Sequence, residues 1–362
     1  MDKYYMKLAI NLAKKGKGRV NPNPTVGAVI VKENKIIGSG YHEYYGGAHA
    51  EVNAFKNAKE EVEGSTLYIT LEPCSHYGST PPCVNKIIDM KVKKVIIGSA
   101  DPNPLVSGQG IKKLVEAGIE VVVGILENEC KELNEVFMKF IVEKRPFVIM
   151  KTAMSLDGKI ATKTGESKWI TGFQSRERVH QLRDEVSGIM VGVNTVIVDD
   201  PELTCRTQNG KSPIRIIIDS KLRIPIDSKV LKNQDIARTI IATTNEADRL
   251  KKKELEEKKI KIIFVESLEG RVDLQALMLK LADEKIDSIL LEGGSTLNFS
   301  ALKQSIVDKV QVYIAPKLIG GEMSKAPVGG IGIEKLMSAF HLDNLKHESI
   351  GEDILIEGYI RL

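Results

Sequence analysis

Hydrophobic positions in the first 143 residues fall into short apolar blocks that alternate with amphipathic stretches. The blocks predict strands, and apolar residues at helical spacing predict the helices between them. Alternation of this kind is typical of a largely parallel sheet covered on both faces, and a hairpin turn at Glu33-Asn34 adds an antiparallel pair. The predicted strands are 26–32, 35–41, 65–71, 93–99 and 119–125, and the predicted helices are 3–15, 49–58, 81–90, 108–118 and 128–143.

A break at Arg145-Pro146 separates this pattern from a second alternating series. We therefore predict two domains, 1–144 and 145–362, which suits a chain of 362 residues. The last two predicted strands follow one another without a strong helix between them, which indicates an antiparallel edge on a mainly parallel sheet. The predicted strands of this part are 147–155, 188–193, 214–220, 237–243, 261–266, 287–293, 309–320 and 353–362.

Composition narrows the class of protein. Apolar residues make up 42% of the chain, but no apolar run approaches the roughly 20 residues of a membrane helix, and no signal segment opens the chain. We therefore expect a cytoplasmic protein that contacts no membrane. The net charge is +4, and the densest basic stretch, 251–259, is interleaved with glutamates, so we expect a solvated helix rather than a nucleic-acid surface.

The four cysteines are too few for a disulfide scaffold, but two of them follow a histidine at suggestive spacing. His49 and Glu51 are separated by one residue, Cys74 follows a proline, and Cys83 comes after it. Zinc deaminases have H-x-E followed by P-C-x-x-C, although here eight residues separate the cysteines. Two thiolates and one imidazole would leave the fourth tetrahedral position for water, with Glu51 as the proton carrier.

Other interpretations of these residues remain open. His49 alone could cap a helix, and the cysteines alone could be buried. A closed structural zinc site would need a fourth protein ligand, which His76 could supply. Glu51 would then have no role, so we favour catalysis. A zinc-stapled binding protein, or a single-activity nucleoside or tRNA deaminase with an unrelated second domain, is the alternative.

Several longer motifs resemble one enzyme family, the bifunctional deaminase/reductase of riboflavin biosynthesis. The resemblance covers nearly the whole chain. In the first part the similar stretches are NPNPTVGAVIV (21–31), AHAEVNA (48–54), TLEPCSHYGSTPPC (70–83) and DPNPLVSGQG (101–110). In the second part they are KTAMSLDGKIAT (151–162), SKWITG (167–172), VGVNTVIVDDPELTCR (191–206) and LEGGSTLNFS (291–300).

The resemblance implies a cytidine-deaminase-like three-layer N-terminal domain and a dihydrofolate-reductase-like C-terminal domain, both α/β. It implies zinc-dependent removal of the C2 amine of a phosphoribosylaminopyrimidine, followed by NADPH-dependent reduction of the ribosyl side chain to ribityl. The expected cofactors are Zn²⁺ and NADPH. The expected partners are this phosphorylated aminopyrimidine and further copies of the chain in a homo-oligomer, with no nucleic acid.

The resemblance also implies site residues. The deaminase substrate would meet Asn23, His42, His76, Asp101 and Asn103. The reductase substrate would meet Ser167, Arg183, Leu203, Arg206 and Glu292. NADPH would meet Ala153, Trp169, Thr195, Asp199 and Ser220, with its phosphates on Gly294, Ser295, Thr296, Leu297, Asn298, Phe299 and Ser300.

Some of these assignments have competing explanations in the sequence. Arg183 could form a surface ion pair with Glu177 or Asp184, so Arg206 is the better candidate for a phosphate. The reductase acid could be Lys151 or Asp199. Ser79 stands where the family usually has a basic residue, so this position can donate a hydrogen bond to a substrate phosphate but carries no charge.

Overall fold

The computed structural model describes residues 1–75, 77, 81–103 and 107–361. The chain divides into two compact units, Met1–Lys144 and Arg145–Leu362, and each is described by itself. None of the helices in the described part of the chain has the length and apolar character that a membrane crossing requires.

The first unit is built on a five-stranded sheet in the order β2-β1-β3-β4-β5. Strand β1 pairs antiparallel with β2 and β3, whereas β3, β4 and β5 run parallel, so the hairpin makes the sheet mixed, as the sequence predicts. The strands are β1 (Gly27–Lys32), β2 (Lys35–Tyr41), β3 (Thr66–Leu71), β4 (Lys94–Ser99) and β5 (Glu120–Val123).

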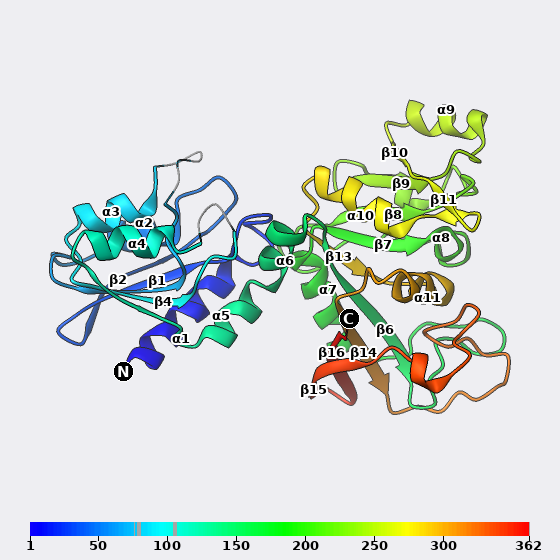
Figure 1. Ribbon diagram of the computed structural model, residues 1–362. Coiled ribbons are helices and arrows are strands. Elements are labelled where there is room, and N and C mark those ends of the chain that lie inside the picture. The colour runs from blue at the N-terminus through cyan, green and yellow to red at the C-terminus, as the bar shows by residue number, and fades with distance from the viewer. Residues whose placement is uncertain (76, 78–80, 104–106, 362) are drawn as a thin grey trace. The chain divides into compact units, whose positions relative to one another are not determined.

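Helices cover both faces of this sheet, which gives three layers (Figure 1). Side chains alternate along each strand: Ile30 and Ile69 pack under α2, α3 and α4, whereas Val29 and Tyr68 face α1 and α5. The helices are α1 (Asp2–Ala13), α2 (Ala50–Lys56), α3 (Cys83–Asp89), α4 (Gln109–Glu116) and α5 (Glu127–Leu133), with a 3₁₀ turn at Lys14–Gly16.

The single helix predicted over 128–143 is wrong, because the structure has two helices, α5 and α6 (Glu135–Glu143), that meet at Asn134. The Asn134 side chain accepts a hydrogen bond from the Thr25 N–H at 2.8 Å and donates one to the Thr25 carbonyl at 3.0 Å. This buried side chain pairs with backbone far away in the sequence, so the interruption comes from tertiary structure rather than from a local break signal.

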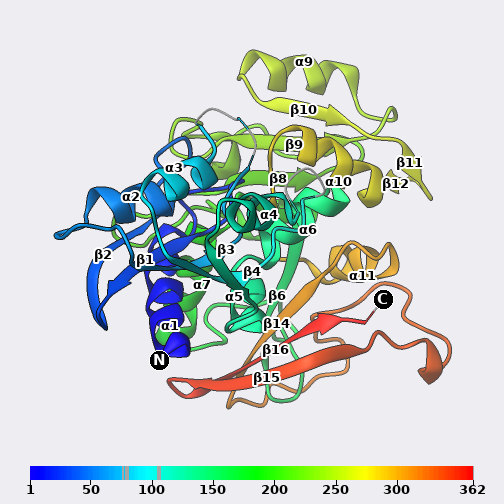
Figure 2. The same ribbon diagram turned by 60° about the vertical axis from the view of Figure 1, so that its left-hand side comes forward.

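The second unit is built on a nine-stranded sheet in the order β10-β9-β8-β7-β13-β6-β14-β16-β15. All pairs from β10 to β14 are parallel, and β16 and β15 add the predicted antiparallel edge (Figure 2). The strands are β6 (Phe147–Ser155), β7 (Gly188–Gly192), β8 (Ile214–Ile218), β9 (Thr239–Thr243), β10 (Lys261–Phe264), β13 (Ser288–Leu291), β14 (Lys309–Ala315), β15 (Leu342–Ile350) and β16 (Asp353–Ile360), with a small hairpin of β11 (Ser267–Leu268) and β12 (Arg271–Val272).

Two apolar cores lie on opposite faces of this sheet. Met190 and Ile216 face a core with α10 and α11, whereas Ile189 and Ile217 face one with α8 and α9. The strand predicted over 309–320 ends at Ala315, and the edge strand β15 was not predicted. The helices are α7 (Phe173–Glu185), α8 (Val193–Asp199), α9 (Arg249–Glu257), α10 (Leu274–Asp283) and α11 (Ser295–Lys303), with 3₁₀ turns at Lys229–Leu231 and Leu336–Ser338.

Candidate metal centre and candidate cofactor cavity

Three element ends converge on the candidate metal centre of the first unit. His49 is the residue before α2, Cys74 follows β3 by three residues, and Cys83 is the first residue of α3. His49 Nδ1 lies 3.1 Å from Cys83 Sγ and 3.6 Å from Cys74 Sγ, and the three ligand atoms lie within 4.8 Å of one another. The structure therefore brings together the residues that the spacing predicted as ligands.

These separations suit zinc. Bonds of about 2.0 Å to nitrogen and 2.3 Å to sulfur in a tetrahedral site place the two ligand atoms about 3.6 Å apart. Among the residues that the structure describes, this cluster has three members and no fourth histidine, cysteine or carboxylate ligand. His76, the alternative fourth ligand and a predicted substrate residue, lies outside the described residues, as does Ser79.

Charges in this pocket are set by burial and by short contacts. The contact between the two thiols lowers the pKa of Cys74 and raises the pKa of Cys83. Glu51 lies in the first turn of α2 and is 3% exposed. Burial raises its pKa to about 7, although His49 opposes this shift. A carboxyl group with such a pKa can both accept and return a proton near neutral pH.

Asn23 and His42 form a short hydrogen-bonded chain beside the ligands. His42 Nδ1 donates to the Ala48 carbonyl at 3.0 Å, so its Nε2 accepts from the Asn23 amide at 3.3 Å. Burial lowers the pKa of His42, which is therefore neutral at pH 7. Its ring meets the His49 ring edge-on, with 5.5 Å between centroids. Asn23 and His42 thus lie close to the cluster, as their predicted role requires.

Asp101 and Asn103 follow β4 at the same sheet edge as Cys74, because β3 and β4 run parallel. The Asp101 carboxylate accepts the Asn103 N–H at 2.8 Å, a contact typical of a turn. The Asp101 N–H donates in turn to Glu72 at 3.2 Å. Glu72 was not singled out in the sequence, although it stands two residues before Cys74.

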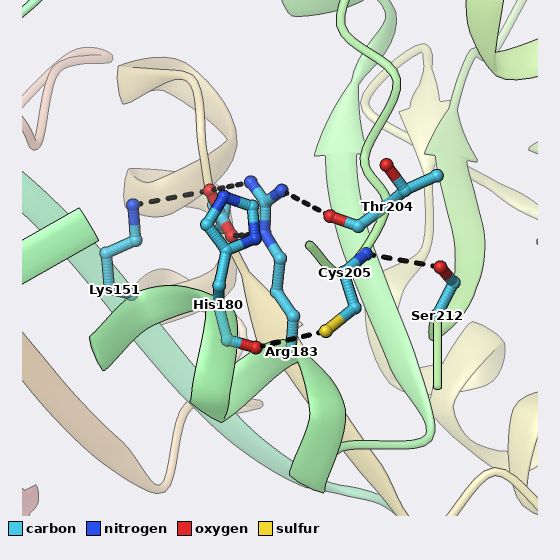
Figure 3. A network of polar contacts seen from close by, with 7 residues as sticks. Lys151, His180, Arg183, Thr204, Cys205 and Ser212 are labelled. Carbon is cyan, nitrogen blue, oxygen red and sulfur yellow. Dashed lines mark hydrogen bonds and ion pairs between the residues drawn. The ribbon is translucent and has the colours of Figure 1, made fainter. Parts of the chain in front are cut away.

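In the second unit, a buried ion-pair network joins β6, α7 and the segment after β13 (Figure 3). Arg183 binds Glu292 through two hydrogen bonds of 2.8 and 3.0 Å, and Lys151 Nζ lies 3.3 Å from the same carboxylate. Burial alone would raise the pKa of Glu292, but Arg183 and Lys151 hold it well below its usual range. The proposed surface pairs of Arg183 with Glu177 or Asp184 are therefore not its main contact.

The loop 202–206 reaches this network through its backbone. Arg183 Nη1 donates to the Thr204 carbonyl at 2.9 Å, next to the predicted substrate residue Leu203, which is buried. Arg206 instead pairs with Glu202 at 3.1 Å, and both side chains are more than half exposed. Its guanidinium is thus accessible.

His180 belongs to the same network and was missed from the sequence (Figure 3). Burial lowers its pKa to about 4, and Arg183 adds to this shift, so its ring is neutral at pH 7. Its Nδ1 has no hydrogen-bond partner among the described residues. The sequence feature that could have identified His180 is its position three residues before Arg183, because this spacing places both side chains on one face of the helix.

A cavity of about 820 Å³ opens along α8 and the start of α11. That volume falls within the range of small-molecule and cofactor sites. Gly294, the N-cap of α11, donates its N–H to Thr195 Oγ1 at 3.1 Å, which joins the two helices at the cavity. The predicted residues that line it are Ser167, Thr195, Asp199, Ser220, Gly294, Ser295, Thr296, Leu297 and Ser300.

Four predicted cofactor residues are absent from the described lining of this cavity. Asn298 is buried and donates to the Pro327 carbonyl at 2.9 Å, and Phe299 packs edge-on against Phe340. Trp169 is exposed beneath the Arg176 guanidinium, which lies 4.7 Å from its ring centroid. Ala153 lies within β6.

Comparison with known proteins covers both units. The RibD C-terminal domain family matches residues 146–356, and the cytidine and deoxycytidylate deaminase zinc-binding region matches residues 1–99. These matches confirm the fold class expected for each unit.

Full-length relatives are similar throughout. The riboflavin biosynthesis protein RibD of Actinobacillus pleuropneumoniae is 51% identical over 98% of this chain and 94% of its own length. RibD of Aquifex aeolicus is 46% identical over 98% of both chains. A Thermotoga maritima structure, a diaminohydroxyphosphoribosylaminopyrimidine deaminase/5-amino-6-(5-phosphoribosylamino)uracil reductase, is 38% identical with a TM-score of 0.85 over 99% of both chains.

A structure of Acinetobacter baumannii RibD is also similar, with 36% identity and a TM-score of 0.88 over 100% of this chain and 99% of the other. Because these relatives cover both units, an unrelated second domain is not favoured. The chain therefore belongs to the RibD family of bifunctional riboflavin biosynthesis deaminase/reductases.

Proposed function

We propose that residues 1–144 deaminate 2,5-diamino-6-(5-phosphoribosylamino)pyrimidin-4-one at C2, and that residues 145–362 reduce the ribosyl side chain of the resulting uracil to ribityl. The observation that carries the deaminase assignment is the cluster of His49, Cys74 and Cys83 with buried Glu51 two residues from the first ligand. Burying a carboxyl group among apolar side chains is costly when it has no partner. The burial of Glu51 beside this cluster is therefore better explained by a role in the site than by core packing.

In the deaminase site, His49, Cys74 and Cys83 would hold zinc, which supplies hydroxide at neutral pH. Glu51 would take one proton from the attacking water and give it to the ring nitrogen. It would then take the second proton from the hydroxyl group on C2 and give it to the amine, so that ammonia departs and the ring gains a carbonyl. Neutral His42, fixed by Ala48, holds Asn23, and Asn23, Asp101 and Asn103 orient the pyrimidine.

In the reductase site, NADPH supplies the hydride. The cavity offers the α11 N-terminus to its phosphates. Among the described residues that line it are Lys163, Lys221, Arg223, Arg271 and Lys325, against one carboxylate, Asp199. This charge suits an anionic dinucleotide. The ribosylamine opens to an imine whose carbon accepts the hydride, and a side chain must protonate the nitrogen.

We assign Lys151, rather than Asp199, as the side chain that donates a proton to the imine nitrogen. Lys151 belongs to the buried network with Glu292 and Arg183, whereas Asp199 lines the cofactor cavity. Arg183 and Glu292 orient the substrate together with Ser167 and Leu203. Arg206, whose guanidinium is exposed, would bind its phosphate.

Product analysis tests both reactions. Purified protein is incubated with the aminopyrimidine ribotide, with and without NADPH, and the products are identified by mass. We expect the deaminated uracil without NADPH and its ribityl derivative with NADPH. Glu51→Gln should retain zinc but release no ammonia, while still reducing deaminated substrate; Glu63→Gln, at an exposed carboxylate, is the control. Zinc loss in proportion to activity would contradict the role of Glu51.

We further propose that the chain forms a homo-oligomer in the cytoplasm. The segment between β14 and β15 exposes large apolar side chains, including Ile331, Leu336 and Met337 at 87%, 89% and 85%. Exposed apolar clusters of this kind are typical of interfaces. Cys74, Cys83, Cys130 and Cys205 form no disulfide, as is typical of proteins in a reducing compartment. Light scattering should give a multiple of the chain mass, and Leu336→Glu should reduce it; a monomeric wild type would contradict this proposal.

A further inference from the structure

The buried carboxylate of Glu72 binds four backbone N–H groups. Its Oε2 accepts from Asp101 at 3.2 Å and from Gly108 at 3.1 Å, and its Oε1 accepts from Gly110 at 3.0 Å and from Ile111 at 3.3 Å. The residue is 3% exposed. The Glu72 side chain is thus held by backbone N–H groups from two separate segments of the chain.

The four N–H donors belong to two segments of the first unit, the one that follows β4 and the one that begins α4. Asp101 opens the segment that carries the predicted substrate residues, and the other three donors surround the N-terminus of α4. Gly108, the N-cap of α4, has no side chain that could cap the free N–H groups of the first turn, so Glu72 does this from another segment. A Cβ on Gly110 would lie 2.3 Å from the Pro73 carbonyl oxygen, so only glycine allows this approach.

Helix α4 also returns a hydrogen bond to the same segment. Lys113 Nζ donates to the Ser75 carbonyl at 2.8 Å. The metal-ligand candidate Cys74 therefore lies between Glu72 and Ser75, and both of these are bonded to α4 or to its first turn. A shift of α4 would move the substrate residues and the ligand segment relative to each other.

We infer that Glu72 is a positioning residue of the deaminase site, which sets Asp101 and Asn103 at a fixed distance from Cys74. This inference rests on the proposed deaminase function. Glutamine at position 72 would keep the shape of the side chain but lose one acceptor oxygen. Its NH₂ group would then face N–H donors, which repel it.

The test compares Glu72→Gln with Glu116→Gln, a change at an exposed carboxylate on α4. We expect the KM for deamination to rise about tenfold or more in Glu72→Gln, as when charge-assisted hydrogen bonds are lost, with kcat changed far less. Zinc content and reductase activity should match those of wild type. If Glu72 only filled space, the KM of Glu72→Gln should equal that of wild type, because glutamate and glutamine side chains have the same shape.

A second pair of variants keeps the inference testable if Glu72→Gln folds poorly. Lys113→Met removes the returning bond and should also raise the deaminase KM, whereas Lys112→Met on the next position should not. An unchanged KM in both test variants overturns the inference. Loss of zinc in step with activity also overturns it, because Glu72 would then support the metal centre alone.

Hydrogen exchange separates this inference from the proposed function. In Glu72→Gln the amides of Gly108, Gly110 and Ile111 should lose protection that Glu116→Gln retains. Unchanged protection overturns the inference whether or not the enzyme is active. If the wild type released no ammonia at all, the proposed deaminase function would fail, and with it the role of Glu72 as a positioning residue for that reaction.

Discussion

Replacing Glu292 by glutamine should destabilise the second unit strongly. The carboxylate accepts two hydrogen bonds from Arg183, at 2.8 and 3.0 Å, and faces Lys151 at 3.3 Å. Glutamine has almost the same shape but no charge. The substitution therefore leaves two mostly buried cations against a neutral amide, and it should also abolish reduction.

The magnitude follows from the burial of the network. Breaking a buried ion pair by removing one partner costs about 3–5 kcal/mol of unfolding free energy. For a domain of this size, about 2–4 °C per kcal/mol gives a fall of about 6–20 °C in the melting temperature. The exposed pair of Glu202 and Arg206 is the matched control, because Glu202→Gln should cost only about 0–1 kcal/mol.

The assay uses the full chain and a probe confined to the second unit. Trp169 is the only tryptophan, so its fluorescence follows the melting of that unit. We expect the double variant Arg183→Met/Glu292→Gln to lose less stability than the sum of the two single variants, because the second change removes an uncompensated cation. Melting of Glu292→Gln at the temperature of Glu202→Gln, or strictly additive losses in the double variant, would refute this reasoning.

The pH dependence has a definite sign. Burial would raise the pKa of Glu292, but Arg183 and Lys151 hold it below its usual range in the folded protein. Because the pKa of this carboxyl group is lower in the folded than in the unfolded protein, its ionisation stabilises the folded state fully above the unfolded pKa of about 4.3. This stabilisation declines below that pH and is lost once the pH falls through the folded pKa as well. The difference in melting temperature between wild type and Glu292→Gln should therefore be full at neutral pH and shrink below about pH 4.

Three further predictions concern the metal, the substrate phosphate and the boundary. Cys83→Ser should lose zinc and deamination together, and stoichiometric zinc in this variant would mean that another group is the third ligand. Arg206→Ala should raise the reductase KM by roughly ten- to a hundredfold while sparing deamination, and an unchanged KM would make Arg206 a plain surface charge. Fragments 1–143 and 145–362 should each fold and keep one activity, as measured by circular dichroism and zinc content; two unfolded fragments would show that the units share a core.

The metal centre was predictable because its signals are local in sequence. His49 and Glu51 lie within one turn of each other, and the two cysteines flank element ends that the apolar pattern already indicates. The sheets were predictable for a similar reason, since buried parallel strands are nearly continuous apolar runs. The strand β15 was missed because its sequence, LDNLKHESI, is mostly polar and exposed at a sheet edge.

What the sequence could not show are partners that lie far apart along the chain. Arg183 has acidic neighbours in its own helix, yet it pairs with Glu292, 109 positions away. Glu72 has no local mark of its role, because its donors follow 29 to 39 residues later. The break at Asn134 has the same origin. In each case the decisive hydrogen bond forms only after the sheet has brought distant segments together.

The bond between Asn134 and Thr25 has a consequence for synthesis of the chain. Thr25 leaves the ribosome 109 residues before its partner, an interval of about 5–22 s at about 5–20 residues per second. All three zinc-ligand candidates precede residue 134, so they are available during that interval, whereas the loop that carries Asn23 still lacks its anchor. We expect the metal side of the deaminase pocket to form first on a growing chain and the substrate side to close last, and zinc uptake by nascent chains halted before residue 134 would reveal that order.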